Sequence, residues 1–164
     1  MLIASDITEK KKTEEKLNLI YSMSIDMIGV ANKNGYFISI NPAVTKILGY
    51  TQEEFLSQSY FDFIHPDDIS RTDNEKHTLF EYIDTLDFVN RYRSKDGTYK
   101  WIEWNVTMVG DLMYAIGRDI TERKKMLQSL HAKYQSPNLA LAGGCAMNSV
   151  ANGKVYLNSP FKQM

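Results

Sequence analysis

The chain has 164 residues, of which 43% are hydrophobic and 24% are charged, and this composition is that of a folded globular protein rather than a disordered one. The formal net charge of -1 gives no reason to expect nucleic acid or an anionic membrane surface as a partner. A single cysteine, Cys145, excludes an internal disulfide, and the lack of an apolar run of ~20 residues predicts no membrane contact and a cytoplasmic location.

The first residues repeat a later stretch of the chain. Ser5-Asp-Ile-Thr-Glu-Lys-Lys11 is echoed by Arg118-Asp-Ile-Thr-Glu-Arg-Lys124, and the separation is about the length of one small domain. Residues 1–21 are therefore predicted to be the end of a preceding domain of the same kind, followed by a linker helix. Leu17 and Ile20 lie on one stripe of that helix, which makes it amphipathic.

A hairpin and short helices are predicted next. Strand formers from 26 to 31 and from 36 to 40 are separated by Asn32-Lys-Asn-Gly35, which is typical of a tight turn. The pair Asn41-Pro42 predicts a helix with Asn41 as its N-cap, and Gly49 predicts its end.

Two more helices are predicted in the middle of the chain. Thr51 followed three positions later by Glu54 predicts a capping box at a helix start. A longer helix is expected after His65-Pro-Asp-Asp68, because proline is favoured at the first helical position and acidic residues in the first turn.

Three antiparallel strands are predicted in the second half. Asp96-Gly97 lies between runs rich in Tyr, Trp, Val and Ile, which is a strong hairpin signal, and Gly110-Asp111 turns the chain into a third strand. Strands on both sides of a helical middle must pair across it to bury one common face. The sequence thus predicts an α+β fold, a five-stranded antiparallel sheet with helices on one face, flanked by N- and C-terminal helices.

Several blocks of residues carry a resemblance to a known family. They are Asn34-Gly-Tyr-Phe, Asn41-Pro-Ala, Leu48-Gly-Tyr-Thr-Gln-Glu-Glu-Phe, Phe63-Ile-His-Pro-Asp-Asp, Arg91-Tyr-Arg-Ser-Lys-Asp-Gly-Thr-Tyr-Lys-Trp and Arg118-Asp-Ile-Thr-Glu-Arg-Lys. Together residues 22–125 resemble a PAS domain with its C-terminal PAC motif. The resemblance implies the same five-stranded fold and a sensory, two-component signalling role. Such domains occur in tandem in sensor histidine kinases, which accounts for the repeat.

The resemblance also implies a small-molecule pocket between the sheet and the helices. Pockets of this kind are apolar with a few polar anchors, and the predicted lining is Ile28, Val30, Ile40, Asn41, Ile47, Phe63, Phe88, Asn90, Trp104 and Ile116. Further candidates for the same pocket are Ile38, Arg91, Asn105 and Val106. The alternative is that all of these apolar groups form a filled core without a ligand.

No catalytic or metal-binding constellation is predicted in residues 1–135. Asp67 and Asp68 are expected to cap a helix rather than to act as an acid and base pair. His65 and His77 each lack a second ligand nearby in sequence, which favours structural positions over metal or haem ligation. A flavin photoreceptor of this family needs a reactive cysteine in the helical middle, which this segment lacks. Haem and flavin are therefore disfavoured, and no cofactor is assigned.

The segment after the last strand is predicted to transmit the signal. By resemblance, Asp119, Ile120 and Thr121 join the last strand to an exit helix over 126–135. Ile120, Leu127 and Tyr134 are spaced by seven, which suits a parallel coiled-coil homodimer through the flanking helices. The alternative is a helix that lies on its own sheet.

Residues 136–164 differ in composition from the rest of the chain. Gly143-Gly144 lies between an expected strand and an expected helix, where backbone N–H groups can approach a phosphate. The stretch resembles the nucleotide-binding region of carbamoyltransferases, with Asn148 and Asn152 in the matching motif. A segment this short cannot build that site. The tail is therefore predicted to be an inactive fragment that does not fold by itself.

Taken together, these residues predict a non-catalytic sensory module that relays a ligand or partner state to the output domain of a larger signalling protein. His131 lacks the acidic neighbour of a phosphoacceptor histidine, so the chain is not predicted to be an enzyme by itself. Two alternatives are a regulatory piece of a carbamoyltransferase-type enzyme and a pure interaction or dimerisation domain.

Overall fold

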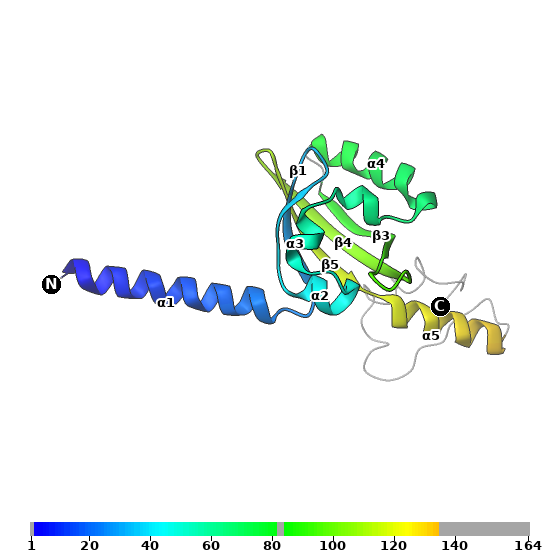
Figure 1. Ribbon diagram of the computed structural model, residues 1–164, viewed down its shortest axis with the longest axis horizontal. Helices are drawn as coiled ribbons and strands as arrows, with labels where there is room; N and C mark the ends of the chain where they lie inside the picture. The colour runs from blue at the N-terminus through cyan, green and yellow to red at the C-terminus, as the bar shows by residue number, and fades with distance from the viewer. Residues whose placement is uncertain (1, 82–83, 135–164) are drawn as a thin grey trace. The chain divides into compact units, whose positions relative to one another are not determined.

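The computed structural model describes residues 2–81 and 84–134. The chain divides into two compact units, of which the first ends at Asp119 and the second begins at Ile120. The first unit contains all five strands, and the described part of the second is helix α5 (Thr121–Tyr134) (Figure 1).

The sheet of the first unit is wholly antiparallel. Its strands lie in the order β2-β1-β5-β4-β3, with β1 at Met27–Asn32, β2 at Phe37–Ile40, β3 at Thr85–Arg93, β4 at Tyr99–Val109 and β5 at Leu112–Asp119. The strand from the second half of the chain, β5, therefore pairs with β1 from the first half. This confirms the predicted α+β fold with its five-stranded sheet.

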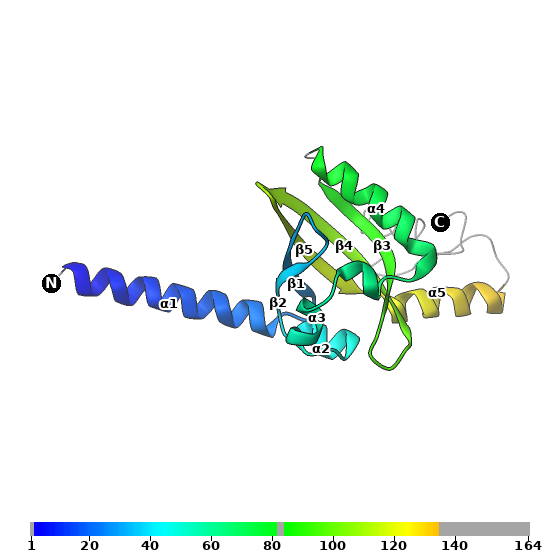
Figure 2. The same cartoon turned by 45° about the horizontal axis from the view of Figure 1, so that its top comes forward.

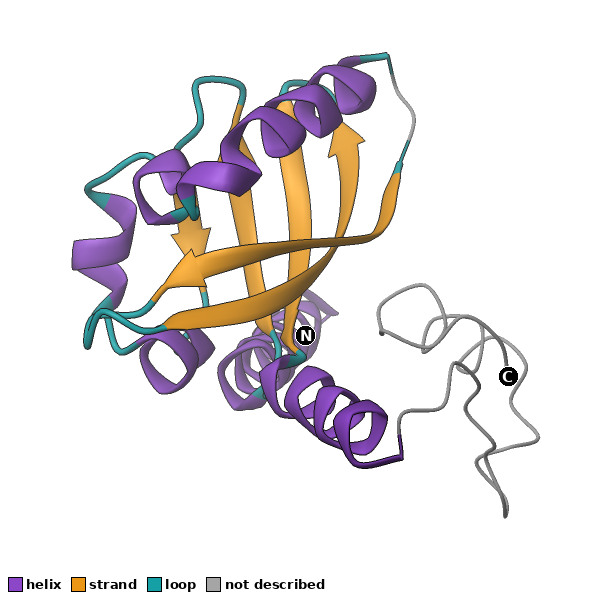
Figure 3. Cartoon of the chain, turned by 90° about the vertical axis from the view of Figure 1, so that its right-hand side faces the viewer, coloured by secondary structure: helices purple, strands orange, loops and turns teal. Residues whose placement is uncertain are grey.

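Helices cover one face of this sheet. They are α2 (Ala43–Leu48), α3 (Gln52–Leu56), the 3-10 helix η1 (Tyr60–Phe63) and α4 (Pro66–Phe80), and Figure 3 shows α4 crossing the face of the strands. In Figure 2, α4 follows the direction of β3. The first helix, α1 (Leu2–Met23), precedes β1 and is continuous over residues that the sequence repeat suggested were the end of another domain.

Local sequence signals account for most of the turns and helix ends. Gly35, Gly49 and Gly97 all have positive φ, as a tight turn or a left-handed helix cap requires. Thr51 and Glu54 form both hydrogen bonds of the predicted capping box. The cap of α4 differs from expectation, because His65 Nδ1 accepts the hydrogen bond from the Asp67 amide.

Asn41 does not cap α2, which corrects the sequence prediction. Its side chain is fully buried and accepts a hydrogen bond from the Ile28 amide at 2.9 Å. Its Nδ2 donates to the carbonyl oxygens of Tyr21 and Asp26, both at 3.0 Å. Asn41 therefore connects the end of α1, the start of β1 and the end of β2, a long-range role that the local Asn-Pro pattern does not indicate.

None of the helices in the described part of the chain combines the length and the apolar character that a membrane crossing requires.

The core lies between the sheet and helices α2 to α4, and its largest fully buried apolar side chains are Phe55, Phe63, Met27, Ile40, Leu48, Ile102 and Val44.

Gly117 in β5 allows the indole of Trp104 in β4 to lie flat on the sheet. A Cβ at position 117 would lie 2.6 Å from Cζ3 of that ring, far inside van der Waals contact. The two residues are direct partners in the antiparallel ladder. The glycine is thus required by the tryptophan.

A double-mutant cycle tests this packing. We expect Gly117→Ala to lower the free energy of unfolding by about 1–3 kcal/mol, because the added methyl group forces the indole out of place. In a Trp104→Leu background the same substitution should cost much less, because the clashing ring is gone. Urea unfolding measures both differences, and an equal cost in the two backgrounds would contradict the proposed contact.

Candidate functional site

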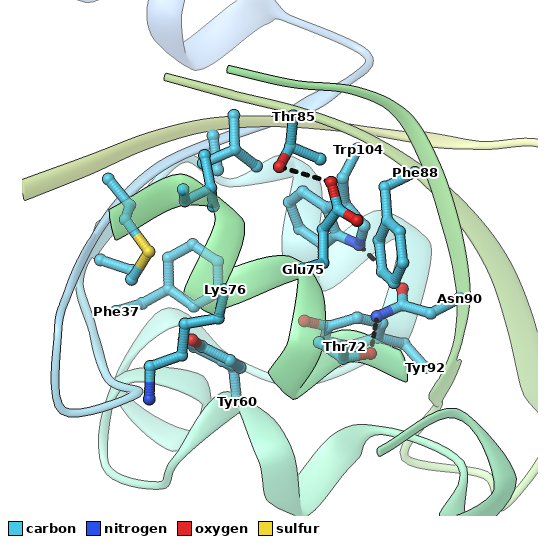
Figure 4. Close-up of a pocket in the computed structure, with 15 residues that line it drawn as sticks. Phe37, Tyr60, Thr72, Glu75, Lys76, Thr85, Phe88, Asn90, Tyr92 and Trp104 are labelled. Carbon is cyan, nitrogen blue, oxygen red and sulfur yellow. Dashed lines mark hydrogen bonds between the residues drawn. The ribbon is translucent and has the colours of Figure 1, made fainter. Parts of the chain in front are cut away.

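A cavity of about 70 Å³ lies between α4 and the sheet. Every strand contributes lining residues, and η1 and α4 close the other side (Figure 4). The sheet side includes the apolar side chains Ala31, Phe88, Val106, Met113 and Ala115, while α4 contributes Thr72, Glu75, Lys76 and Leu79. The structure therefore leaves an open space at this place between the helices and the sheet.

Four aromatic rings form a continuous wall of the cavity, here called the aromatic wall: Phe37, Tyr60, Tyr92 and Trp104. The Phe37 ring lies 5.8 Å from the Tyr60 ring and 6.1 Å from the Trp104 ring, centroid to centroid. Trp104 in turn lies 5.4 Å from Tyr92. Rings at these spacings pack favourably against one another, so the wall is stiff.

A hydrogen-bond chain holds α4 against the sheet at the cavity. Trp104 Nε1 donates to Asn90 Oδ1 at 3.0 Å, and Asn90 Nδ2 donates to Thr72 Oγ1 at 3.1 Å. Thr72 Oγ1 donates to the Asp68 carbonyl at 2.8 Å. Each side-chain polar group of this chain therefore has a partner, although Asn90 is only 1% exposed.

The same helix is held to β3 by an ion pair. Arg91 donates from Nε, Nη2 and its backbone amide to the Asp68 carboxylate, at 2.9, 2.8 and 2.9 Å. Burial of Asp68 opposes its ionisation, but the hydrogen bonds and charge of Arg91 outweigh that effect and lower the pKa of the Asp68 carboxyl. The guanidinium also lies over the Trp101 ring, 5.2 Å from its centroid.

The remaining polar groups of the cavity come from α4. Glu75 Oε1 accepts a hydrogen bond from Thr85 Oγ1 at 2.8 Å, which joins the helix to the start of β3. Lys76 Nζ lies 5.5 Å from the Phe61 ring centroid and 5.7 Å from the Phe80 ring centroid. Its ammonium thus has aromatic faces as neighbours, and among the described residues no carboxylate pairs with it.

The structure brings only part of the predicted pocket together. Phe88, Asn90 and Trp104 line the cavity, as does Val106. Arg91 and Asn105 do not line it, because Arg91 binds Asp68 and Asn105 Oδ1 accepts from the Asp87 amide. Asp87 is the one described non-glycine residue with a positive φ, 57°, and it lies in an irregular stretch of β3 beside the cavity.

Ile28, Val30 and Ile116 lie on the opposite face of the sheet, which corrects the prediction for these residues and for Ile38. Ile38 and Ile116 are 52% and 47% exposed. Their neighbours Ala31 and Ala115 face the cavity instead. Both faces of β1 and β5 carry apolar residues, so alternation alone does not say which set points toward the helices. In the structure Ala31 and Ala115 point toward the helices, and their small side chains leave the space that forms the cavity.

Four other predicted residues also lie away from the cavity. Ile40 and Phe63 are almost completely buried in the core between the sheet, α2 and α3. Asn41 is occupied by its three structural hydrogen bonds. Ile47 lines a separate shallow groove with Ser94 and Lys95. Sequence reasoning missed Tyr60, Tyr92, Glu75 and Lys76, whose spacing along the chain carries no local signal.

The predicted transmission residues fall at the border of the two units. Asp119 ends β5 and lies 3.8 Å from the ammonium of Lys100, while Ile120 and Thr121 begin the second unit and are buried. Gly143, Gly144, Asn148 and Asn152 of the predicted nucleotide-like motif lie outside the described residues.

The described residues hold no cluster of three or more His, Cys, Asp and Glu side chains arranged to bind a metal ion. His77 is instead within 3.6 Å of Asp73 one helical turn away, on the exposed side of α4. The arrangement around the cavity offers shape, hydrogen-bond donors and aromatic surface rather than a set of reacting groups.

Comparison with known proteins identifies this architecture. Residues 37–117 match the family model of the PAS fold. This chain contains a PAS domain. The PAS domain of the HTR-like protein from Haloarcula marismortui is 25% identical and superposes with a TM-score of 0.57, over 71% of this chain and 99% of that one. A domain of a sensory box sensor histidine kinase/response regulator from Geobacter sulfurreducens is 18% identical, with a TM-score of 0.58 over 65% and 94% of the chains.

Two curated proteins are related in sequence. The human basic helix-loop-helix ARNT-like protein 2 is 29% identical over 89 residues, and the white collar 1 protein of Neurospora crassa is 28% identical over 122 residues. These matches cover 51% and 73% of this chain but only 14% and 10% of those proteins. PAS domains are in general sensory and signalling modules. The matches give no support to the resemblance of residues 136–164 to carbamoyltransferases.

The Asp68–Arg91 ion pair predicts a pH-dependent stability. Because the folded pKa of Asp68 lies below the unfolded value of about 3.9, the stabilisation is fully present above that pH and is lost as the pH falls through the folded pKa. We expect Asp68→Asn to lower the free energy of unfolding at pH 7 by about 2–3 kcal/mol. The difference from the natural protein should shrink below about pH 4.

Asp67→Asn is the matched control for urea unfolding across this pH range. Its side chain is 73% exposed and reaches Arg91 only at 3.4 Å, so its effect should stay below about 0.5 kcal/mol. A deficit of Asp68→Asn that is independent of pH would contradict the ion-pair account.

Proposed function

We propose that this PAS domain is a non-catalytic sensory module in which a small molecule in the cavity changes how α4 and the sheet pack. The observation that carries the proposal is the position of the cavity, which is lined by α4, η1 and all five strands at once. A ligand there contacts both layers of the domain, so its binding energy can favour one arrangement of the layers over another.

The flanking segments are placed to receive such a change. β1 and β5 are antiparallel neighbours, and Met27 at the start of β1 pairs with Gly117 near the end of β5. The Arg118 guanidinium also binds the Asp26 carboxylate, with Nη2 and Oδ2 2.8 Å apart. Strand β5, which lines the cavity with Met113 and Ala115, thus ends beside the start of β1, which follows α1 in the chain.

The proposed relay runs from β5 through Asp119, Ile120 and Thr121 into α5, and from there to an output domain. In this proposal residues 1–21 link to a preceding domain, 22–125 form the PAS domain with its PAC motif, and 126–135 continue the exit helix.

Cavity filling tests the sensory role. Native mass spectrometry of the full chain against a small-molecule library should detect one-to-one adducts. Ala115→Leu should abolish these adducts, because the added side-chain atoms occupy the cavity that Ala115 lines. Ala132→Leu, at an exposed position of α5, is the matched control and should retain them. The absence of adducts, or adducts that survive Ala115→Leu, would contradict a ligand-binding role.

A second candidate function is protein interaction through the flanking helices. Apolar side chains near the end of α1 are largely exposed, with Leu17 at 61%, Ile20 at 59% and Met23 at 68%. Exposed apolar stripes of this kind commonly mark interfaces, and PAS domains commonly mediate protein–protein contacts. We propose a homodimer through this stripe.

The oligomeric state tests the second candidate. Light scattering after size-exclusion chromatography of the full chain should give the mass of a dimer. Ile20→Glu should shift this mass to that of the monomer, because burying a carboxylate in an apolar interface costs free energy. Asn18→Glu, an exposed position on the opposite face of the same helix, is the matched control and should remain dimeric. A dimer that tolerates Ile20→Glu would exclude this stripe as the interface.

A further inference from the structure

Two tyrosines of the aromatic wall are buried without using their hydroxyl groups. Tyr60 is 7% exposed and Tyr92 is 3% exposed, and both line the cavity. Within the described part of the chain, neither hydroxyl makes a hydrogen bond. Neither hydroxyl oxygen is among the fully buried polar atoms that lack a partner, so both reach the open space of the cavity, where a bound molecule can accept from them.

The two hydroxyl groups belong to one end of the cavity. Figure 4 shows Tyr60 and Tyr92 toward the end opposite Thr85. They are also close enough to interact electrostatically, since Tyr60 is one cause of the raised pKa of Tyr92, after burial. Burial, and secondarily Asp73, raises the pKa of Tyr60 to about 12. Both groups therefore keep their protons at neutral pH and can donate.

The two hydroxyl donors favour an acceptor as their partner, and the charges near this end have both signs, Lys76 in the cavity lining and Asp73 near Tyr60. Lys76 lines the same cavity, and its ammonium faces the Phe61 and Phe80 rings rather than a carboxylate. The nearest polar groups of the cavity do not compete, because Thr72 and Asn90 already bond to each other. Glu75 is likewise engaged by Thr85 at the far end. Two hydroxyl donors at this end are thus available to an oxygen, and the Lys76 ammonium lies over rings that do not line the cavity.

We propose that the cavity binds a small molecule whose carbonyl-type oxygen accepts hydrogen bonds from the hydroxyl groups of Tyr60 and Tyr92, with its apolar body against Phe37 and Trp104. This inference rests on the proposed sensory function and names the ligand class. An engineered cavity of about 150 Å³ holds benzene. The cavity of about 70 Å³ here therefore takes a body on the order of three to five non-hydrogen atoms.

Three molecules of nearly equal shape test the proposal: acetone, isobutene and acetate. Each is titrated into the full chain and followed by the two tryptophan indole N–H signals in nuclear magnetic resonance spectra. Trp104 lines the cavity and should shift, while Trp101 does not line it and serves as the internal reference. We expect acetone to bind more tightly than isobutene, although isobutene is the more hydrophobic of the two.

Tyr60→Phe and Tyr92→Phe remove only the hydroxyl groups. Each should weaken the acetone affinity about five- to tenfold, the effect of one hydrogen bond, and should leave isobutene unchanged. Tyr50→Phe is the matched control, because Tyr50 packs on Phe55 and Phe63 and does not line the cavity. Without ligand, Tyr92→Phe should unfold at the same or a higher urea concentration than the natural protein, because no hydrogen bond is lost.

The acetate arm identifies the form of the oxygen. If acetate binds more tightly than acetone, and Lys76→Met removes this gain in affinity, the natural ligand carries a carboxylate. If acetone binds more tightly than acetate, the ligand carries a neutral carbonyl. Any of three results would overturn the proposal. Isobutene could bind with the same affinity as acetone, the Trp104 signal could stay unshifted with all three molecules, or the two tyrosine variants could leave the acetone affinity unchanged. Isobutene binding alone would leave the sensory function standing, because the cavity would still accept a ligand that Ala115→Leu excludes.

Discussion

The hydrogen bond from the Trp104 indole to Asn90 is the interaction on which the rest of the site depends. It continues through Asn90 Nδ2 to Thr72 and so connects β4, β3 and α4 in one chain. The indole ring meanwhile lies against Gly117 of β5, where no side chain competes for its place. Because each polar group of the chain is satisfied, α4 is fixed over the sheet at a defined distance.

This arrangement explains why a cavity persists inside a packed domain. Protein interiors normally fill such space, since dispersion contacts are lost around a void. Here Ala31 and Ala115 supply too little volume, and the aromatic wall is held by its own ring contacts and cannot collapse inward. The hydroxyl groups of Tyr60 and Tyr92 reach this space as donors without a protein partner among the described residues, and a ligand of matching chemistry can accept from them.

Local chemistry made much of the fold predictable. The glycines with positive φ at 35, 49 and 97 and the capping box of Thr51 and Glu54 act within a few residues, so their spacing is visible in the sequence. The antiparallel five-stranded sheet followed from those boundaries together with the need to bury one common face.

The site was harder to predict because its features depend on distant residues. Asn41 has the neighbours of a helix cap but bonds to α1 and β1. Ile28 and Ile116 are larger and more hydrophobic than Ala31 and Ala115, so the sequence favours the isoleucines as core residues. In the structure the alanines face the helices, and their small size leaves room for the cavity. Tyr60 in η1 and Tyr92 in β3 are far apart in sequence, and only the packing of η1 on the sheet places their rings in one wall.

The central claim is that occupation of the cavity reaches the end of β5. Xenon enters dry apolar cavities without specific chemistry, and its effect on the backbone amide signals of the full chain tests this claim directly. The account predicts shifts at Trp104, at Met113 and Ala115, and onward through Gly117 to Asp119 and the first turn of α5. Shifts that stop at the cavity-lining residues and leave the signals from Gly117 onward unchanged would contradict it.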